Sequence, residues 1–254
     1  METLKKIAVP TLAIIAFLAF WEFIVWINGW PNYKMASPSD LPPAFSRYSG
    51  LFIEMGWQTL WRTVAGLGLA VIVGTLLGMA MGFSRITRDA LYPLLVGFNA
   101  IPKATLVPVI ALIFIGQHDF NTVLMAFLIS FFPIAVSVGI GLSTLEPEYR
   151  DILRSLGASK VTIFRKIALP KTLPEFFGAL KVSVTLAFIG TNLVEIVSPH
   201  GRGLGALFKS GETNGDYPLM FAVLIALAVL GIVLYYAVVA LERIFAGWAE
   251  RPQS

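Results

Sequence analysis

Six long apolar runs, separated by short polar or charged segments, dominate the sequence. They cover approximately residues 7–27, 57–83, 91–116, 122–142, 176–197 and 218–241. Each run reaches the ~20 apolar residues that an α-helix needs to cross a hydrocarbon layer about 30 Å thick. The pattern predicts an all-α, polytopic membrane protein with six transmembrane helices, in which residues 1–254 form a single transmembrane domain.

Composition supports the membrane assignment. Hydrophobic side chains make up 57% of the chain and charged ones only 13%, against roughly 25% charged in ordinary soluble domains. The first run follows Lys5 and Lys6, but it holds Trp21 and Trp26 where a signal peptide carries small residues before its cleavage site. We therefore expect this run to be an uncleaved anchor. Cysteine is absent from the sequence, which excludes disulfide frameworks and thiolate metal sites.

The distribution of basic residues predicts the orientation. If the N-terminus is cytoplasmic, twelve of the 19 Lys and Arg residues fall in inside segments and four in outside segments. Cytoplasmic loops carry such an excess of basic residues. We therefore expect both termini in the cytoplasm. Three outside segments are predicted. The first is irregular up to about Phe45, the second is a tight turn at residues 117–121, and the third contains a short surface or re-entrant helix within residues 198–217.

The inside segment 146–171 differs from a plain connector. It carries six basic and three acidic residues and two short amphipathic helical patterns that meet at Gly157. Glu146-Pro147-Glu148 is a typical helix start, and Pro170 closes the segment. The pattern alone is compatible with a segment that lies on lipid headgroups and with one that docks into a cytoplasmic partner.

The amino-acid sequence of this segment is similar to a motif of a known protein family. The segment resembles the EAA loop of bacterial ABC importer permeases. It reads Asp151-Ile-Leu-Arg-Ser-Leu-Gly157, then nine residues, then Ile167-Ala-Leu-Pro170. The pattern of the family reads E-A-A, three residues, G, nine residues, I-x-L-P. The second half matches at every spacing, whereas the three EAA positions are Asp151, Ile152 and Leu153, so only the acid is kept.

Further stretches resemble the nitrate, sulfonate, taurine and bicarbonate branch of these permeases. The likeness extends over residues 53–248 and includes Leu91-Tyr-Pro93, Ala100-Ile-Pro-Lys103 with Pro108, Glu195 with Gly203-Leu-Gly205, and Leu241-Glu-Arg243 with Trp248.

The resemblance implies the architecture of a type I ABC importer permease in the bacterial inner membrane. It implies three partners: a cytoplasmic ATPase dimer, a second permease copy, and a periplasmic or lipid-anchored substrate-binding protein. In such permeases the loop between spans four and five forms the coupling helix. The coupling residues carried over by position are Asp151, Ile152, Leu153, Leu156, Gly157, Ala158, Phe164, Ile167, Leu169 and Pro170.

No nucleotide-binding motif of the form G-x-x-x-x-G-K-[ST] occurs in the sequence. We therefore expect no cofactor in this chain and no enzymatic activity of its own, with ATP and Mg²⁺ bound by the partner ATPase. His118 and His200 lie in separate loops without cysteine nearby, which makes a poor ligand set. No metal site is expected.

Polar residues inside the predicted spans are candidates for the translocation path: Asn99, Lys103, Thr185, Thr191, Asn192 and Glu195. Lys103 follows Pro102, so it is either a positive element near an anionic substrate or a side chain that reaches the interface from a broken helix. Glu195 has three readings, as a gate, a docking residue or a helix-end hydrogen-bond acceptor. Thr and Asn in spans more often bind neighbouring helices than line a path.

Gly74, Gly78 and Gly82 form overlapping G-x-x-x-G units in the second run. Such spacing permits close approach of another helix, which we expect to belong to the same chain.

The expected function is that of an ABC importer permease for a small anionic solute such as nitrate, a sulfonate or taurine. A thiamine-precursor pyrimidine or an aromatic acid is the alternative substrate. An ion-coupled secondary transporter requires paired intramembrane acids, and only Glu22, Glu195 and Glu242 are available. An intramembrane enzyme requires a nucleophile with a base at membrane depth, and neither histidine lies there.

Overall fold

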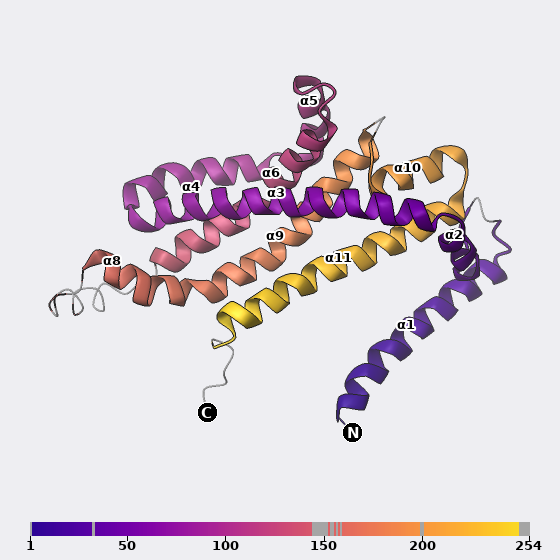
Figure 1. Cartoon of the computed structure of the whole chain (residues 1–254), viewed down its shortest axis with the longest axis horizontal. Helices are drawn as coiled ribbons and strands as arrows, with labels where there is room; N and C mark the ends of the chain where they lie inside the picture. The colour runs from indigo at the N-terminus through magenta and orange to yellow at the C-terminus, as the bar shows by residue number, and fades with distance from the viewer. Residues whose placement is uncertain are drawn as a thin grey trace.

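The computed structural model describes residues 2–31, 34–143, 152, 155, 157, 159–198 and 201–248. Every regular element in these residues is a helix, as predicted. The long helices, drawn in Figure 1, are α1 (Glu2–Ile27), α3 (Ser49–Phe83), α4 (Arg85–Ala100), α6 (His118–Ser143), α9 (Leu169–Val197) and α11 (Tyr217–Ala246). The short ones are η1 (Pro38–Asp40), α2 (Leu41–Arg47), η2 (Lys103–Thr105), α5 (Leu106–Ile113), α8 (Lys160–Ile163), the π-helical turn η3 (Phe164–Ala168) and α10 (Leu204–Asn214).

Three helices form the centre of the bundle. α6 packs against α3 on one side and against α9 on the other, and α11 lies along α9. Their shared apolar core contains Met81, Phe131, Ile134, Val138 and Val184. α1 diverges from this bundle and meets the rest of the chain at the end where α2 lies (Figure 1).

The close contact between α3 and α6 depends on glycine. A Cβ atom added to Gly78 would lie 2.6 Å from Val138 Cβ, and one added to Gly82 would lie 2.6 Å from Leu142 Cβ. Gly74 meets Ile134 in the same way. The three glycines of the G-x-x-x-G units therefore face α6 of the same chain.

Four helical stretches among the described residues are long and apolar enough to cross a membrane. They are Ser49–Phe83, His118–Ser143, Phe164–Val197 and Tyr217–Ala246. The pair Arg85–Ala100 and Lys103–Ile113 counts as a fifth if it forms one broken span. In α1 the apolar stretch found is Thr11–Ile27, which is shorter. The predicted count of six therefore stays a prediction.

The run 91–116 does not form one straight helix. α4 ends at Ala100, and the axis turns by 75° before η2 and α5. The cause is Pro102, which forces Ile101 into an extended conformation (φ −65°, ψ 129°) and offers no N–H for a helical hydrogen bond.

Two connecting segments are more ordered than the sequence pattern predicts. α2 starts at Leu41, four residues before Phe45, because Pro42 and Pro43 occupy the first helical turn, where a missing N–H costs nothing. α3 starts at Ser49, well before the apolar run at 57. The predicted short helix within residues 198–217 is present as α10.

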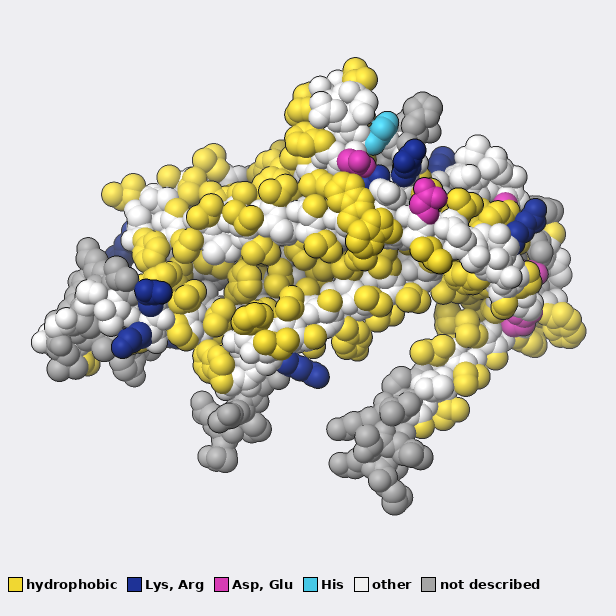
Figure 2. Space-filling view, in the orientation of Figure 1, with side chains coloured by type: hydrophobic (Ala, Val, Ile, Leu, Met, Phe, Trp, Pro, Cys, Tyr) yellow, Lys and Arg dark blue, Asp and Glu magenta, His cyan; other side chains and the backbone are white. Residues whose placement is uncertain are grey.

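Figure 2 shows hydrophobic side chains along the flanks of the long helices, with most of the charged groups towards their ends. The exposed apolar residues include Ile53, Trp57, Ile72 and Leu76 on α3 and Val229, Ile232 and Val233 on α11. Such an apolar surface is suited to contact with lipid. The helices also satisfy their own backbone hydrogen bonds, as the hydrocarbon layer requires.

Candidate functional site

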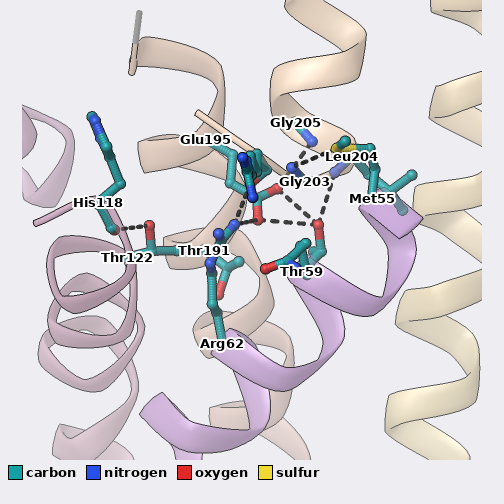
Figure 3. Close-up of polar contacts among 12 residues, drawn as sticks. Met55, Thr59, Arg62, His118, Thr122, Thr191, Glu195, Gly203, Leu204 and Gly205 are labelled. Atoms are coloured by element: carbon teal, nitrogen blue, oxygen red, sulfur yellow. Dashed lines mark hydrogen bonds and ion pairs between the residues drawn. The ribbon is translucent and has the colours of Figure 1, made fainter. Parts of the chain in front are cut away.

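Charged side chains from three helices meet at the end of the bundle where α6 begins and α9 ends. Figure 3 shows two of them, Arg62 and Glu195, together with Thr59. Arg62 comes from α3, Asp119 from the first turn of α6 and Glu195 from the last turn of α9. Together with Thr59 we call them the polar cluster. The side chains of Arg62 and Glu195 are only 3% and 1% exposed. Charges buried to this degree require partners, because desolvation costs several kcal/mol per ion.

Arg62 binds three elements through one guanidinium group. Its Nε and Nη2 donate to Asp119 Oδ1 at 2.9 and 2.5 Å. Its Nη1 donates to Glu195 Oε1 at 3.2 Å and to the carbonyl oxygen of Arg202. Asp119 is 61% exposed, so this half of the cluster is open to solvent. The other half is sealed inside the protein.

Glu195 and Thr59 together cap the start of α10. The carboxylate of Glu195 accepts the N–H of Gly205 at 3.0 Å and the hydroxyl of Thr59 at 2.8 Å. The same hydroxyl oxygen accepts the N–H of Leu204 at 2.8 Å. A helix start leaves such N–H groups without partners inside the helix and favours a negative charge nearby. The polar cluster therefore fixes the position of α10.

The backbone at residues 203–205 approaches the carboxylate of Glu195 closely because Gly203 and Gly205 have no side chains. Gly203 has φ +131°, and a Cβ at this position would collide with the carboxylate of Glu195. A Cβ on Gly205 would lie 2.8 Å from Glu195 Cβ. The Gly203-Leu-Gly205 stretch thus provides the space in which the acid meets the helix start.

Among the three readings of Glu195, this geometry fits the helix-end hydrogen bond. Sequence reasoning missed Arg62, Thr59 and Asp119. The available signal was Arg62 itself, because an ionisable residue inside a span usually has a named partner.

Lys103 has a role that the sequence analysis did not consider. Its Nζ donates to the carbonyl oxygens of Phe98, Asn99 and Ile101 at 3.1, 2.7 and 3.2 Å. The ammonium also lies 5.3 Å from the centre of the Phe98 ring. The break at Pro102 interrupts the helical hydrogen bonds at this end, where the Phe98 carbonyl also accepts the N–H of Ile101 at 3.3 Å. Lys103 therefore caps the end of α4.

The six path candidates do not form one site. Lys103 and Asn99 lie at the break after α4, whereas Thr191 is buried and its hydroxyl bonds to that of Thr63 on α3 at 3.0 Å. Asn192 Nδ2 donates to the Phe188 carbonyl at 2.8 Å. Thr185 is the exposed candidate on α9 and lines a cavity.

Only part of the predicted coupling segment can be described. Asp151, Leu153, Leu156 and Ala158 lie outside the described residues. Ile152 is exposed, and Ile167 in η3 is half-buried. At the start of α9, Leu169 is exposed and Pro170 is half-buried.

Two described residues give the backbone conformation and one side-chain contact of this segment. Gly157 has φ +82° with open space around its Cα. The Phe164 ring lies 5.1 Å from the Phe83 ring, so the segment contacts the end of α3.

No group of three or more His, Asp or Glu residues that could hold a metal occurs in the described part of the chain. His118 Nδ1 lies 2.9 Å from Ser198 Oγ and so joins α6 to the end of α9. His200 lies outside the described residues.

Residues 66–246 match the sequence profile of a family described as "Binding-protein-dependent transport system inner membrane component". The chain belongs to this family. The permease is 32% identical over 243 residues to the formylaminopyrimidine transport permease protein ThiX of Halalkalibacterium halodurans, covering 95% of this chain and 96% of the relative. It is 31% identical to the riboflavin transport system permease protein RibX of Chloroflexus aurantiacus, covering 98% and 94%.

The nitrate import permease protein NrtB of Synechocystis sp. is 27% identical, with 90% of the permease and 84% of the relative covered. A solved structure of the MetNI methionine ABC transporter in an inward-facing conformation shares the fold. Its TM-score is 0.64 at 20% identity, covering 78% of the permease and 98% of that chain. The resemblance to ABC importer permeases, and to the nitrate branch among them, is confirmed.

Proposed function

We propose that this permease forms the membrane path of an ABC importer that takes up a small, flat nitrogen heterocycle of the pyrimidine or flavin kind. Membership of the importer family is established by the match over residues 66–246. The observation that carries the substrate class is that two relatives above 30% identity, aligned over nearly their whole length, are named for formylaminopyrimidine and riboflavin.

The anionic substrate expected from the sequence is the second candidate. It is favoured by the nitrate permease among the relatives. Lys103 was the residue offered for anion contact, yet its ammonium group donates to three backbone carbonyls. Arg62 is paired with two carboxylates. The donors of Lys103 are thus occupied by backbone carbonyls and the charge of Arg62 is balanced by carboxylates, which favours the heterocycle.

The proposal includes the assembly. The permease pairs with a second copy in the bacterial inner membrane, with six spans and both termini in the cytoplasm. The coupling segment 146–171 docks into a cytoplasmic ATPase dimer, which binds ATP and Mg²⁺. A substrate-binding protein delivers the solute from outside. The turn at Gly157 and the contact between Phe164 and Phe83 support a segment that transmits force to α3.

The test is uptake by the complete complex. The permease is reconstituted in proteoliposomes with its partner ATPase and binding protein, and uptake of labelled formylaminopyrimidine, riboflavin and nitrate is compared with and without ATP. We expect ATP-dependent uptake of a heterocycle and none of nitrate. ATP-dependent uptake of nitrate alone would show the anion to be the substrate. Uptake driven by an ion gradient without ATP would identify a secondary transporter.

A further inference from the structure

A second polar site lies between α9 and α11. The two helices flank a shallow, open cavity of about 520 Å³ lined by Gly178, Lys181, Val182, Thr185, Leu186 and Tyr235. Lys181 precedes Glu195 by 14 residues, which corresponds to roughly 21 Å along the helix at 1.5 Å per residue. The cavity is thus remote from the polar cluster. Both of its helices are long and apolar enough to span the membrane.

One residue that lines the cavity, Lys181, forms an ion pair with Glu242, which does not line it. Lys181 Nζ lies 2.7 Å from Glu242 Oε2, and the two side chains are 25% and 11% exposed. Charged groups within spans are costly, and they usually face a cavity and mark a substrate path. The pair joins α9 to α11, and the Lys181 side chain also lines the cavity, where a polar solute can reach it.

Two further groups suit a flat solute. Tyr235 is 40% exposed at the cavity wall, so a face of its ring is available for stacking. Thr185 is exposed one helical turn after Lys181, and its hydroxyl has only a long hydrogen bond, 3.3 Å, to the Lys181 carbonyl. The cavity volume lies within the range of roughly 300–1,000 Å³ typical of small-molecule sites.

We propose that this cavity is a substrate subsite on the translocation path. A planar nitrogen heterocycle stacks on Tyr235 and accepts a hydrogen bond from Lys181, while Thr185 bonds to the edge of the ring. The substrate class rests on the proposed function. The position of the subsite rests on the cavity and on the Lys181 side chain that lines it.

The alternative is that lipid fills the cavity, and a single thiol distinguishes the two. The chain has no cysteine, so Thr185→Cys carries the only thiol in the permease. A thiolate is the reactive form, and hydrocarbon suppresses its formation. Val229→Cys is the matched control, because Val229 is 55% exposed on α11 and does not line the cavity.

The whole complex in proteoliposomes, with a cysteine-free ATPase and binding protein, is treated with a charged methanethiosulfonate reagent. We expect Thr185→Cys to react at least about tenfold faster than Val229→Cys, because only the former meets water. Formylaminopyrimidine delivered by the binding protein should slow this reaction several-fold. Equal rates for the two thiols, or no protection by a heterocycle that the wild type transports, would overturn the subsite.

A second pair of variants tests the stacking. Tyr235→Leu should lower heterocycle uptake by about tenfold, the upper range for loss of an aromatic contact, while stimulation of the ATPase by the binding protein persists. Tyr236→Leu is the control, since Tyr236 is 64% exposed and outside the lining. Equal uptake by the two variants contradicts the subsite. If the wild-type complex transports no heterocycle, the proposed function is wrong. The reactivity of Thr185→Cys relative to Val229→Cys would still show whether the cavity is open to water.

Discussion

Arg62 Nη1 on α3 and Glu195 Oε1 on α9 lie 3.2 Å apart although 133 residues separate them in sequence. The carboxylate of Glu195 also receives the first N–H groups of α10, one directly and one through Thr59. One buried pair therefore sets the relative position of two core helices and of α10, which packs on α9 and α11.

Replacing Glu195 by Gln should destabilise the permease strongly. The amide cannot balance the charge of Arg62, and breaking a buried pair costs about 3 kcal/mol or more. Thermal unfolding in detergent measures the effect. Glu212→Gln is the matched control, because Glu212 is exposed on α10 and paired with Lys209, and exposed pairs contribute less than about 1 kcal/mol. Equal unfolding temperatures for the two variants would contradict the role of the polar cluster.

Gly203→Ala should loosen α10. The substitution places a methyl group against the carboxylate of Glu195 at a backbone angle of φ +131°, and such strain costs about 1–3 kcal/mol. Gly50→Ala serves as the control because Gly50 lies in α3 with open space around it, where Ala is the better helix former. Unfolding temperature and uptake should fall for Gly203→Ala and not for Gly50→Ala. If both variants behave alike, glycine is not required at the start of α10.

The long apolar runs of the sequence predict the long helices of this permease, but they do not predict the partners of its polar groups. The runs that became α3, α6, α9 and α11 are visible in the sequence, and Pro102 announces the break after α4. The contact of Arg62 with Glu195 depends on how α3 and α9 pack, which no local pattern encodes. The hydrogen bonds of Lys103 were not predicted for a related reason, because the 75° bend decides which carbonyls its ammonium reaches.

Lys103→Met should lower the unfolding temperature of the permease and its uptake of the heterocycle. The ammonium caps the end of α4 through three carbonyls, and hydrogen bonds to a charged group contribute about 1.5–3 kcal/mol. Unfolding temperature and formylaminopyrimidine uptake of the variant provide the measurement, with Lys209→Met as an exposed control. Values equal to those of the control would show that the ammonium is not needed at the end of α4.

Gly78→Ala should weaken the packing of α3 on α6. The added Cβ would lie 2.6 Å from Val138 Cβ and 2.7 Å from the Ala135 carbonyl oxygen, and overpacking of this kind costs about 1–3 kcal/mol. Gly68→Ala, on the same helix but with open space, is the control for unfolding temperature. Val138→Ala should partly restore stability to the Gly78 variant. Failure of that rescue would point to the carbonyl as the obstacle.

Gly157 tests whether backbone conformation or crowding governs the coupling segment. Its φ of +82° favours glycine, while no atom lies within 4 Å of an added Cβ. Asn tolerates this region and Val does not, at a cost of about 1–2 kcal/mol. Gly157→Asn should therefore retain the ATPase during purification of the tagged permease, and Gly157→Val should lose it. The amount of each variant in the membrane controls for folding. Because the space around Gly157 is open, equal retention of the ATPase by both variants would mean that the turn is not needed for docking.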